Sequence, residues 1–271
     1  MSKVSVAEAA SLLGVNVQRV HQRITDGSLR AERIGHQWVI DDADLIRLGH
    51  RPTGRPLSSR SAWAMAYVAA RDLPDDGAPQ ARDLETADDI AAPVPPRISS
   101  PEVSRARARL GGFLRQVLSP YEDPKDQSDS DTVAVSLRSL LRNRAQRRTF
   151  RAAPSDLGDL RSDDRLHLSG ISLATSGLSS GDIVEGYIDS QELEGIVRDF
   201  LLSDALPVDA NVVLHVVDPA VALGWRLLVD SWLPLAADLA EYHRPRETER
   251  AASIVRDVAR RHPAFATKGS R

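Results

Sequence analysis

Residues 4–27 have the sequence VSVAEAASLLGVNVQRVHQRITDG, which is typical of two short helices joined by a tight turn. Ser5 and Glu8 have the spacing of a capping box, so we expect the first helix to begin beside Ser5. Gly14 supplies the left-handed backbone that ends this helix, and Asn16 is placed to cap a second helix. The pattern therefore predicts a helix-turn-helix.

The second predicted helix separates apolar from polar residues. Val17, Val20 and Ile24 recur at helical spacing and are expected to face inward. The opposite side carries a polar set made of Gln18, Arg19, His21, Gln22 and Arg23. Arginine bonds guanine through O6 and N7, and glutamine pairs with adenine through N6 and N7. This face is therefore predicted to contact bases in a DNA major groove, and the alternative is a solvated, arginine-decorated surface.

A basic hairpin follows the two helices. Residues 29–34 and 38–40 are predicted strands with a polar turn at 35–37. Arg33 and His36 are placed to reach phosphates or an adjacent minor groove. Trp38 is expected to pack beneath a short closing helix that ends near residue 48. Residues 1–52 are therefore predicted to form a winged helix-turn-helix that binds DNA.

The spacing of this module resembles the excisionase branch of the MerR-like winged-helix proteins. The resemblance is carried by Asp26-Gly27-x-Leu29, Arg33-x-Gly35-x-x-Trp38-x-Ile40 and Asp44-Leu45.

Just beyond this module, residues 51–56 have the sequence RPTGRP. A flat arginine-proline segment fits the narrow minor groove of A·T-rich DNA, where the negative potential attracts guanidinium groups. Arg51 and Arg55 are therefore candidate DNA contacts. The alternative is a rigid linker that leads to the N-cap of the next helix. Residues 53–71 are predicted to be this arm and an apolar bridging helix that packs on the DNA-binding module or on a second copy.

Composition excludes several classes of function. The chain has 271 residues and no cysteine, which excludes disulfides, thiol catalysis and thiolate zinc sites. The seven histidines lack metal-ligand spacing, and no cofactor is expected. No apolar run is long enough to span a membrane, and Met1-Ser2-Lys3 leads directly into the first helix. We expect a cytoplasmic protein with no membrane partner.

Charge is distributed unevenly along the chain. Residues 1–60 hold nine Lys/Arg and six Asp/Glu (+3), and residues 61–96 hold two and seven (−5). Residues 97–151 hold twelve and six (+6), and residues 152–271 hold twelve and nineteen (−7), which gives the total of −3. A basic front and an acidic back indicate two different partners.

The middle of the chain is predicted to alternate linkers and basic helices. Residues 72–101 are rich in Asp, Ala and Pro and are expected to be a flexible linker. Residues 102–150 are expected to hold a basic helix over 102–118, an acidic linker over 119–131 and a helix over 133–148. Five arginines decorate the last helix: Arg138, Arg142, Arg144, Arg147 and Arg148. They are expected to clamp a phosphate backbone, to lie in solvent, or to pair with the acidic C-terminal domain.

Residues 151–271 are predicted to be a small α/β domain. Strands are expected over 166–170 and 211–217, and helices over 182–187, 191–202, 233–242 and from Pro245 through Val258. His215 is expected to be a satisfied core histidine. Asp238, with Glu241, Arg244 and Arg246, is expected to be a surface charge cluster. No phosphate-binding loop, paired-carboxylate motif or nucleophile elbow is present, so no enzyme is expected. The predicted fold class is mainly α with α+β.

The chain resembles the actinobacterial helix-turn-helix antitoxins of the AbiEi-like, type IV group. The resemblance is carried by Gly54-Arg55-Pro56-Leu57 with Ala62-Trp63-Ala64, Phe150-Arg151-Ala152-x-Pro154-Ser155, Leu168-Ser169-Gly170, Tyr187, Asn211-Val212-Val213-Leu214-x-Val216-Val217, and Asp238-Leu239-Ala240-Glu241-x-x-x-Pro245-Arg246. It implies a DNA-binding repressor of its own operon, acting as a homodimer on double-stranded operator DNA. It also implies that residues 151–271 counteract a nucleotidyltransferase-like toxin. The excisionase-like wing and the long acidic linkers depart from the better known members.

Two alternatives belong to other classes. One is an excisionase-like architectural factor that bends DNA at direct repeats without a protein partner. The other is a ligand-responsive transcriptional regulator whose α/β domain senses a metabolite.

Overall fold

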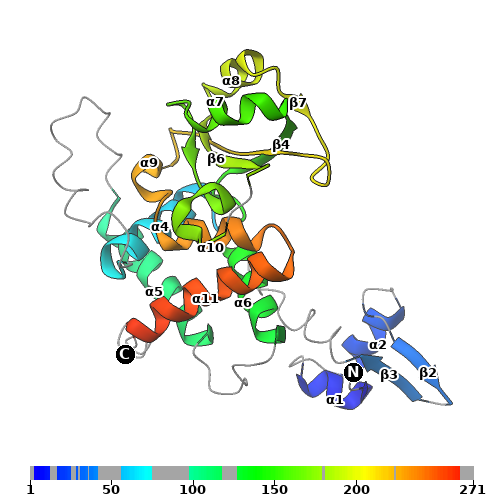
Figure 1. Ribbon diagram of the computed structural model, residues 1–271. Coiled ribbons are helices and arrows are strands. Elements are labelled where there is room, and N and C mark those ends of the chain that lie inside the picture. The colour runs from blue at the N-terminus through cyan, green and yellow to red at the C-terminus, as the bar shows by residue number, and fades with distance from the viewer. Residues whose placement is uncertain are drawn as a thin grey trace.

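The structure is a computed structural model with mixed α and β architecture (Figure 1). It describes residues 3–12, 17–25, 29, 31–35, 37–41, 56–74, 98–117, 127–178, 181–222 and 224–262. The N-terminal elements are β1 (Lys3–Ser5), α1 (Val6–Leu12), α2 (Val17–Thr25), β2 (Ala31–Ile34) and β3 (Gln37–Asp41). The later elements are α4 (Ser59–Asp72), α5 (Ser100–Val117), α6 (Gln127–Leu141), β4 (Gln146–Arg151), α7 (Leu157–Arg161), β5 (His167–Leu168), β6 (Val184–Asp189), α8 (Leu193–Asp199), β7 (Ser203–Asp204), β8 (Val212–Val217), α9 (Trp225–Leu228), α10 (Trp232–Ala240) and α11 (Pro245–Arg261), with short 3-10 turns at Pro154–Asp156, Gly170–Ser172 and Ala174–Ser176.

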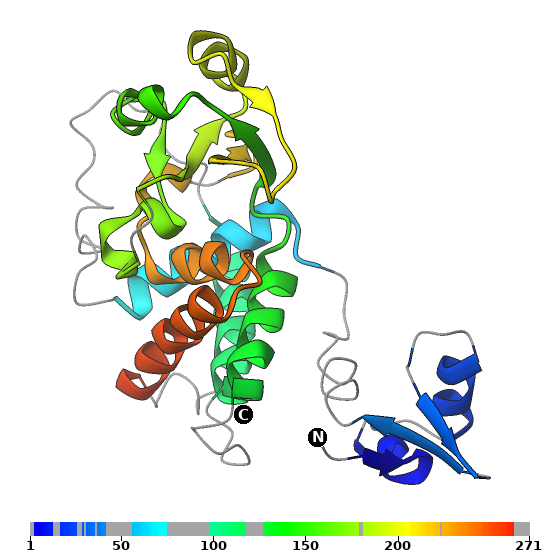
Figure 2. The ribbon, with the colours of Figure 1, turned by 45° about the vertical axis from the view of Figure 1, so that its right-hand side comes forward.

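The N-terminal elements form a module with its own core. Its sheet has the order β1-β3-β2, with both pairs antiparallel. The buried side chains come from both helices, the strands and Leu29: Ala9, Ala10, Val20, Leu29 and Ile40. The predicted helices and hairpin are confirmed, whereas β1 was not predicted. The predicted closing helix at 41–48 lies beyond Asp41, outside the described residues. Figure 2 shows this module beside the larger body.

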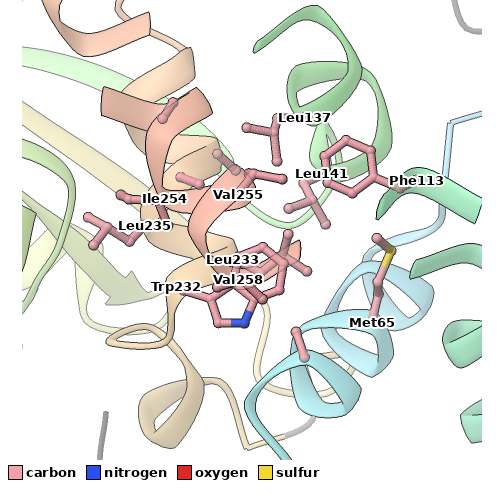
Figure 3. Packing of buried hydrophobic residues seen from close by; sticks show 14 of the residues in the cluster. Met65, Phe113, Leu137, Leu141, Trp232, Leu233, Leu235, Ile254, Val255 and Val258 are labelled. Carbon is pink, nitrogen blue, oxygen red and sulfur yellow. The ribbon is translucent and has the colours of Figure 1, made fainter. Parts of the chain in front are cut away.

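A layer of five helices forms the largest core of the molecule. Helices α4, α5, α6, α10 and α11 bury a continuous apolar cluster, part of which is shown in Figure 3. Met65 of α4, Phe113 of α5, Leu137 of α6 and Val255 of α11 all belong to it. Helix α4 was expected to pack on the N-terminal module or on a second copy, and its buried residues instead belong to the core of the larger body. Ser58 caps α4 by accepting a hydrogen bond from the Ser61 N–H at 3.3 Å, as the linker alternative for this segment predicts.

A five-stranded sheet lies against the helical layer (Figure 1). Its strand order is β5-β6-β8-β4-β7. Strands β6 and β8 are parallel, and the other neighbours are antiparallel. Every residue of β8 is buried, which agrees with the continuous apolar run that predicted it. The arrangement gives a sheet covered on both faces, with α10 on one side.

Two predicted helical segments are strands. Residues 182–187 were expected to be helical, but Val184–Asp189 form β6. The helix expected over 133–148 begins earlier and ends at Leu141, and Gln146–Arg151 form β4. In both cases tertiary pairing overrides local periodicity, since each strand hydrogen-bonds to β8 from opposite sides. The other predicted strands and helices of the C-terminal part are present at similar bounds.

The predicted linker over 72–101 falls largely outside the described residues, since only its two ends are described. None of the helices in the described ranges is long and apolar enough to cross a membrane.

Candidate nucleic-acid interface and the buried polar cluster

Helix α2 turns a polar face away from the N-terminal core. Val20 is fully buried, and Ile24 packs against the same cluster. Gln18, His21 and Gln22 are exposed, as expected both for a face that contacts bases and for a solvated surface. Val17 was expected to face inward, but its side chain is 46% exposed.

Two arginines of the predicted interface, Arg19 and Arg23, also lie on α2. Their side chains are outside the described part of the chain. His36, Arg51 and Arg55, three further predicted contacts, lie outside the described residues altogether.

The hairpin places Arg33 on its exposed surface. Arg33 pairs with Trp38 across strands β2 and β3, and its guanidinium lies 5.9 Å from the centre of the Trp38 ring. Gly35 has a φ of +63° at the turn, a conformation that glycine adopts without strain. At this distance the cation interacts with the face of the ring, and the exposed side chain is accessible to a phosphate.

Strand β1 connects the first helix to this hairpin. Val4 pairs with Ile40, and Ser5 with Val39. Because α1 begins at Val6, directly after β1, this pairing holds the helices and the hairpin on one core. The exposed amides of α2 and the cation of Arg33 are thus carried by one small unit. Such a surface offers donors for base edges and for phosphate oxygens.

A second polar group of residues lies deep in the larger body. Asp238 of α10 is fully buried and accepts hydrogen bonds from Arg144, with Nη2 at 2.5 Å, and from the Tyr187 hydroxyl at 2.8 Å. The hydroxyl of Ser169 donates to its other oxygen. Arg144 also donates to Glu241 Oε1 at 2.6 Å. We call Arg144, Ser169, Glu185, Tyr187, His215, Asp238 and Glu241 the buried polar cluster.

The other half of the cluster is centred on Glu185 of β6. Its Oε1 lies 2.9 Å from His215 Nε2, and its Oε2 accepts hydrogen bonds from the Ile171 N–H and the Tyr242 hydroxyl, each at 2.9 Å. His215 is 1% exposed. It is therefore a satisfied core histidine, as predicted.

Burial and charge act against each other in this cluster. Burial favours the neutral form of His215, but Asp238 and Glu185 outweigh it and raise the pKa of the imidazole above its ordinary value. Burial would also raise the pKa of Glu241, but the neighbouring Arg144 guanidinium lowers that pKa to about 2. Burial raises the pKa of Tyr187 well above its ordinary range, so its hydroxyl stays protonated and donates to Asp238.

The cluster corrects two predictions. Asp238 was expected on the surface but is enclosed between α10 and the sheet. Arg144, Arg147 and Arg148 were expected on the helix over 133–148, with phosphate clamping as one of three alternatives, but they lie in the turn after α6 and on β4. The alternative of pairing with the C-terminal domain is confirmed for Arg144, for Arg148, which lies 2.9 Å from Asp204, and for Arg138, which donates to the Ala240 carbonyl at 2.7 Å. Arg142 is exposed.

A sequence signal for this cluster existed in α10. Its nine residues, WLPLAADLA, are all buried, and a helix that is apolar on every side belongs in a core. A single aspartate in such a helix requires a buried cationic partner. The partner could not be identified from spacing, since Arg144 is separated from Asp238 by 94 positions. The cluster fastens α10 to the sheet.

The histidines and carboxylates of the described residues form no group of three that could hold a metal ion. No protein-family model, no curated protein and no solved structure matches this chain.

Proposed function

We propose that this chain is a DNA-binding antitoxin that represses its own toxin-antitoxin operon and counteracts a nucleotidyltransferase-like toxin. In this proposal the N-terminal module is a winged helix, α2 is its recognition helix and the β2–β3 hairpin is its wing. The chain acts by binding, in the cytoplasm, and not by catalysis. The C-terminal part, which has the antitoxin role, is assigned by its resemblance to the AbiEi-like group.

The observation that carries the DNA-binding part is the two-sided character of α2. Val20 is buried while Gln18, His21 and Gln22 are exposed on the other side. The nine-residue helix is short enough to lie in a major groove, where such side chains contact base edges. The exposed Arg33 on the adjacent hairpin supports a phosphate contact beside the groove.

Alanine variants of the proposed base contacts on α2 and of the proposed phosphate contact at Arg33 test this assignment. The full chain is titrated with DNA from upstream of its own gene and with shuffled DNA of equal length. Gln18→Ala is expected to cost about 1–3 kcal/mol on the upstream DNA and little on shuffled DNA. Arg19→Ala and Arg23→Ala are expected to behave in the same way.

Arg33→Ala is expected to weaken binding to both DNAs and to reduce the salt slope by about 1. Gln116→Ala, an exposed glutamine on α5, is the matched control and should bind as the unchanged chain does. Equal binding by the Gln18, Arg19 and Arg23 variants and the unchanged chain contradicts the recognition-helix assignment.

The antitoxin part is tested with the tagged chain purified from its native cells at physiological ionic strength. The proposal predicts a stoichiometric nucleotidyltransferase-like protein in the eluate. DNA fragments without a protein partner would contradict contact-based neutralisation and favour an architectural or ligand-sensing regulator.

A further inference from the structure

Three large apolar side chains are strongly exposed within one short segment of the C-terminal part. Leu201, Leu206 and Val208 are 84%, 69% and 81% exposed, and we call them the β7 patch because they flank β7. Isolated exposed hydrophobic residues are ordinary, but a group of them marks an interaction surface. The other large hydrophobic residues found exposed in the described ranges are 36–47% exposed.

Leu201 is unusual in its backbone as well. It follows the end of α8 with a φ of +49°, and the Leu202 N–H returns to the Val197 carbonyl at 2.9 Å. Glycine is the usual residue at such a helix end because a Cβ is disfavoured there. In a single copy of the chain, Leu201 has two unfavourable features: a left-handed backbone and an apolar side chain exposed to water. We therefore expect its side chain to contact a partner.

The three residues flank, in sequence, the edge strand β7, which is two residues long. Strand β7 is the last strand in the order β5-β6-β8-β4-β7, and it pairs on one side with β4. On its other side no strand of the described residues follows. An exposed edge presents unpaired backbone groups that accept another strand.

The charges around this edge indicate what the partner is. Arg148 lies 2.9 Å from Asp204, and Arg198 lies 3.5 Å from Asp199. Arg151 donates to the backbone carbonyl of another aspartate, Asp209, at 2.9 Å. Asp199 also pairs with Arg165 at 2.8 Å, and Arg165 pairs with Asp163 at 2.7 Å. These residues are four arginines and four aspartates, so their charges balance. A surface with equal numbers of both signs can face its own copy across a two-fold axis, whereas a strongly basic or acidic partner would meet like charges.

We propose that two copies of this chain associate through β7, edge to edge and antiparallel, with the β7 patch buried between them. This interface would join the two subunits of the homodimer that the resemblance to the AbiEi-like group implies, and in this respect the inference rests on the proposed function. Dimer formation is measured without DNA, so a negative result would not contradict the proposal that α2 binds DNA.

Sedimentation velocity of the full chain over a wide range of concentration tests the interface. The unchanged chain is expected to be a dimer, and Leu206→Ser/Val208→Ser is expected to raise the dissociation constant by about tenfold or more. Leu227→Ser, at a 47% exposed leucine on α9, is the control and should leave the dimer intact. Leu201→Gly is expected to weaken the dimer while raising the melting temperature of the monomer, because the backbone strain is removed.

A monomer at every concentration overturns the proposal. A dimer that the patch variants leave unchanged overturns it as well, since the copies then meet elsewhere. Equal weakening by Leu227→Ser and the patch variants also overturns it, because the effect is then not specific to β7.

Discussion

Replacing Arg144 with alanine removes a buried cation that joins three parts of the fold. The side chain is 3% exposed. It donates to Asp238 of α10 at 2.5 Å, to Glu241 at 2.6 Å and to the Tyr187 hydroxyl of β6 at 2.7 Å. The alanine variant leaves two carboxylates in a site from which water is largely excluded. Removing one partner of a buried ion pair in this way costs about 3–5 kcal/mol.

The assay is unfolding of the full chain by urea and by heat. For a chain of this size, a loss of 3–5 kcal/mol corresponds to a fall in melting temperature of roughly 6–20 °C. Arg142→Ala is the matched control, because this arginine is two positions away and exposed. Its effect should lie within about 0.5 kcal/mol of zero.

The pH dependence of the stability difference between the unchanged chain and Arg144→Ala distinguishes the loss of a charge from the loss of packing. The pKa of Glu241 is about 2 in the folded chain, below its ordinary value of 4.5. Its stabilising contribution is therefore complete above pH 4.5 and is lost as the pH falls toward 2. Without Arg144 the low pKa is not maintained, so the difference between the two chains should narrow over this range. A destabilisation no larger than that of Arg142→Ala, or one that is constant from pH 6 to pH 3, would refute the reasoning.

The remaining predictions concern two glycines and a partly buried ion pair. Gly170→Ala is expected to destabilise the chain by about 2 kcal/mol or more, because the φ of Gly170 is +54° and an added Cβ would lie within 2.2 Å of the Glu185 carboxyl carbon. Gly158→Ala is the control, because nothing lies within 4 Å of an added Cβ there, and it should stabilise α7 by about 0.5–1 kcal/mol. Equal effects in thermal unfolding would contradict this difference. The hydrogen bonds from Arg60 lower the pKa of Glu102 to about 2, so an NMR titration should give that value, and Arg60→Gln should return it toward 4.5. An unchanged pKa in the variant would contradict the pairing.

Elements with a complete local signal were predictable from the sequence. The two helices of the N-terminal module, the hairpin at Gly35 and the buried strand Val212–Val217 are confirmed. Helix α11 begins at Pro245, as predicted. In each case the turn residues and the periodicity lie within one short window and agree with each other.

The missed elements depend on residues far away in the chain. Strand β6 includes Glu185, whose burial is possible because His215 comes to it from β8, 30 positions later. Strand β1 is three residues long and exists because β3 pairs with it. The arginines after α6 have the composition of a solvated face, and pairing with Asp238 changes the role of Arg144. Local patterns do not contain such long-range pairs.

The most direct measurement compares the affinity of the full chain for DNA from upstream of its own gene with its affinity for shuffled DNA of equal length. Fluorescence anisotropy at about 0.15 M salt gives both values under conditions where long-range charge contacts are screened. A sequence-specific repressor is expected to prefer the upstream DNA by about 1,000-fold or more. Equal affinity for the two DNAs would contradict the proposal that α2 is a recognition helix and that the chain represses its own operon.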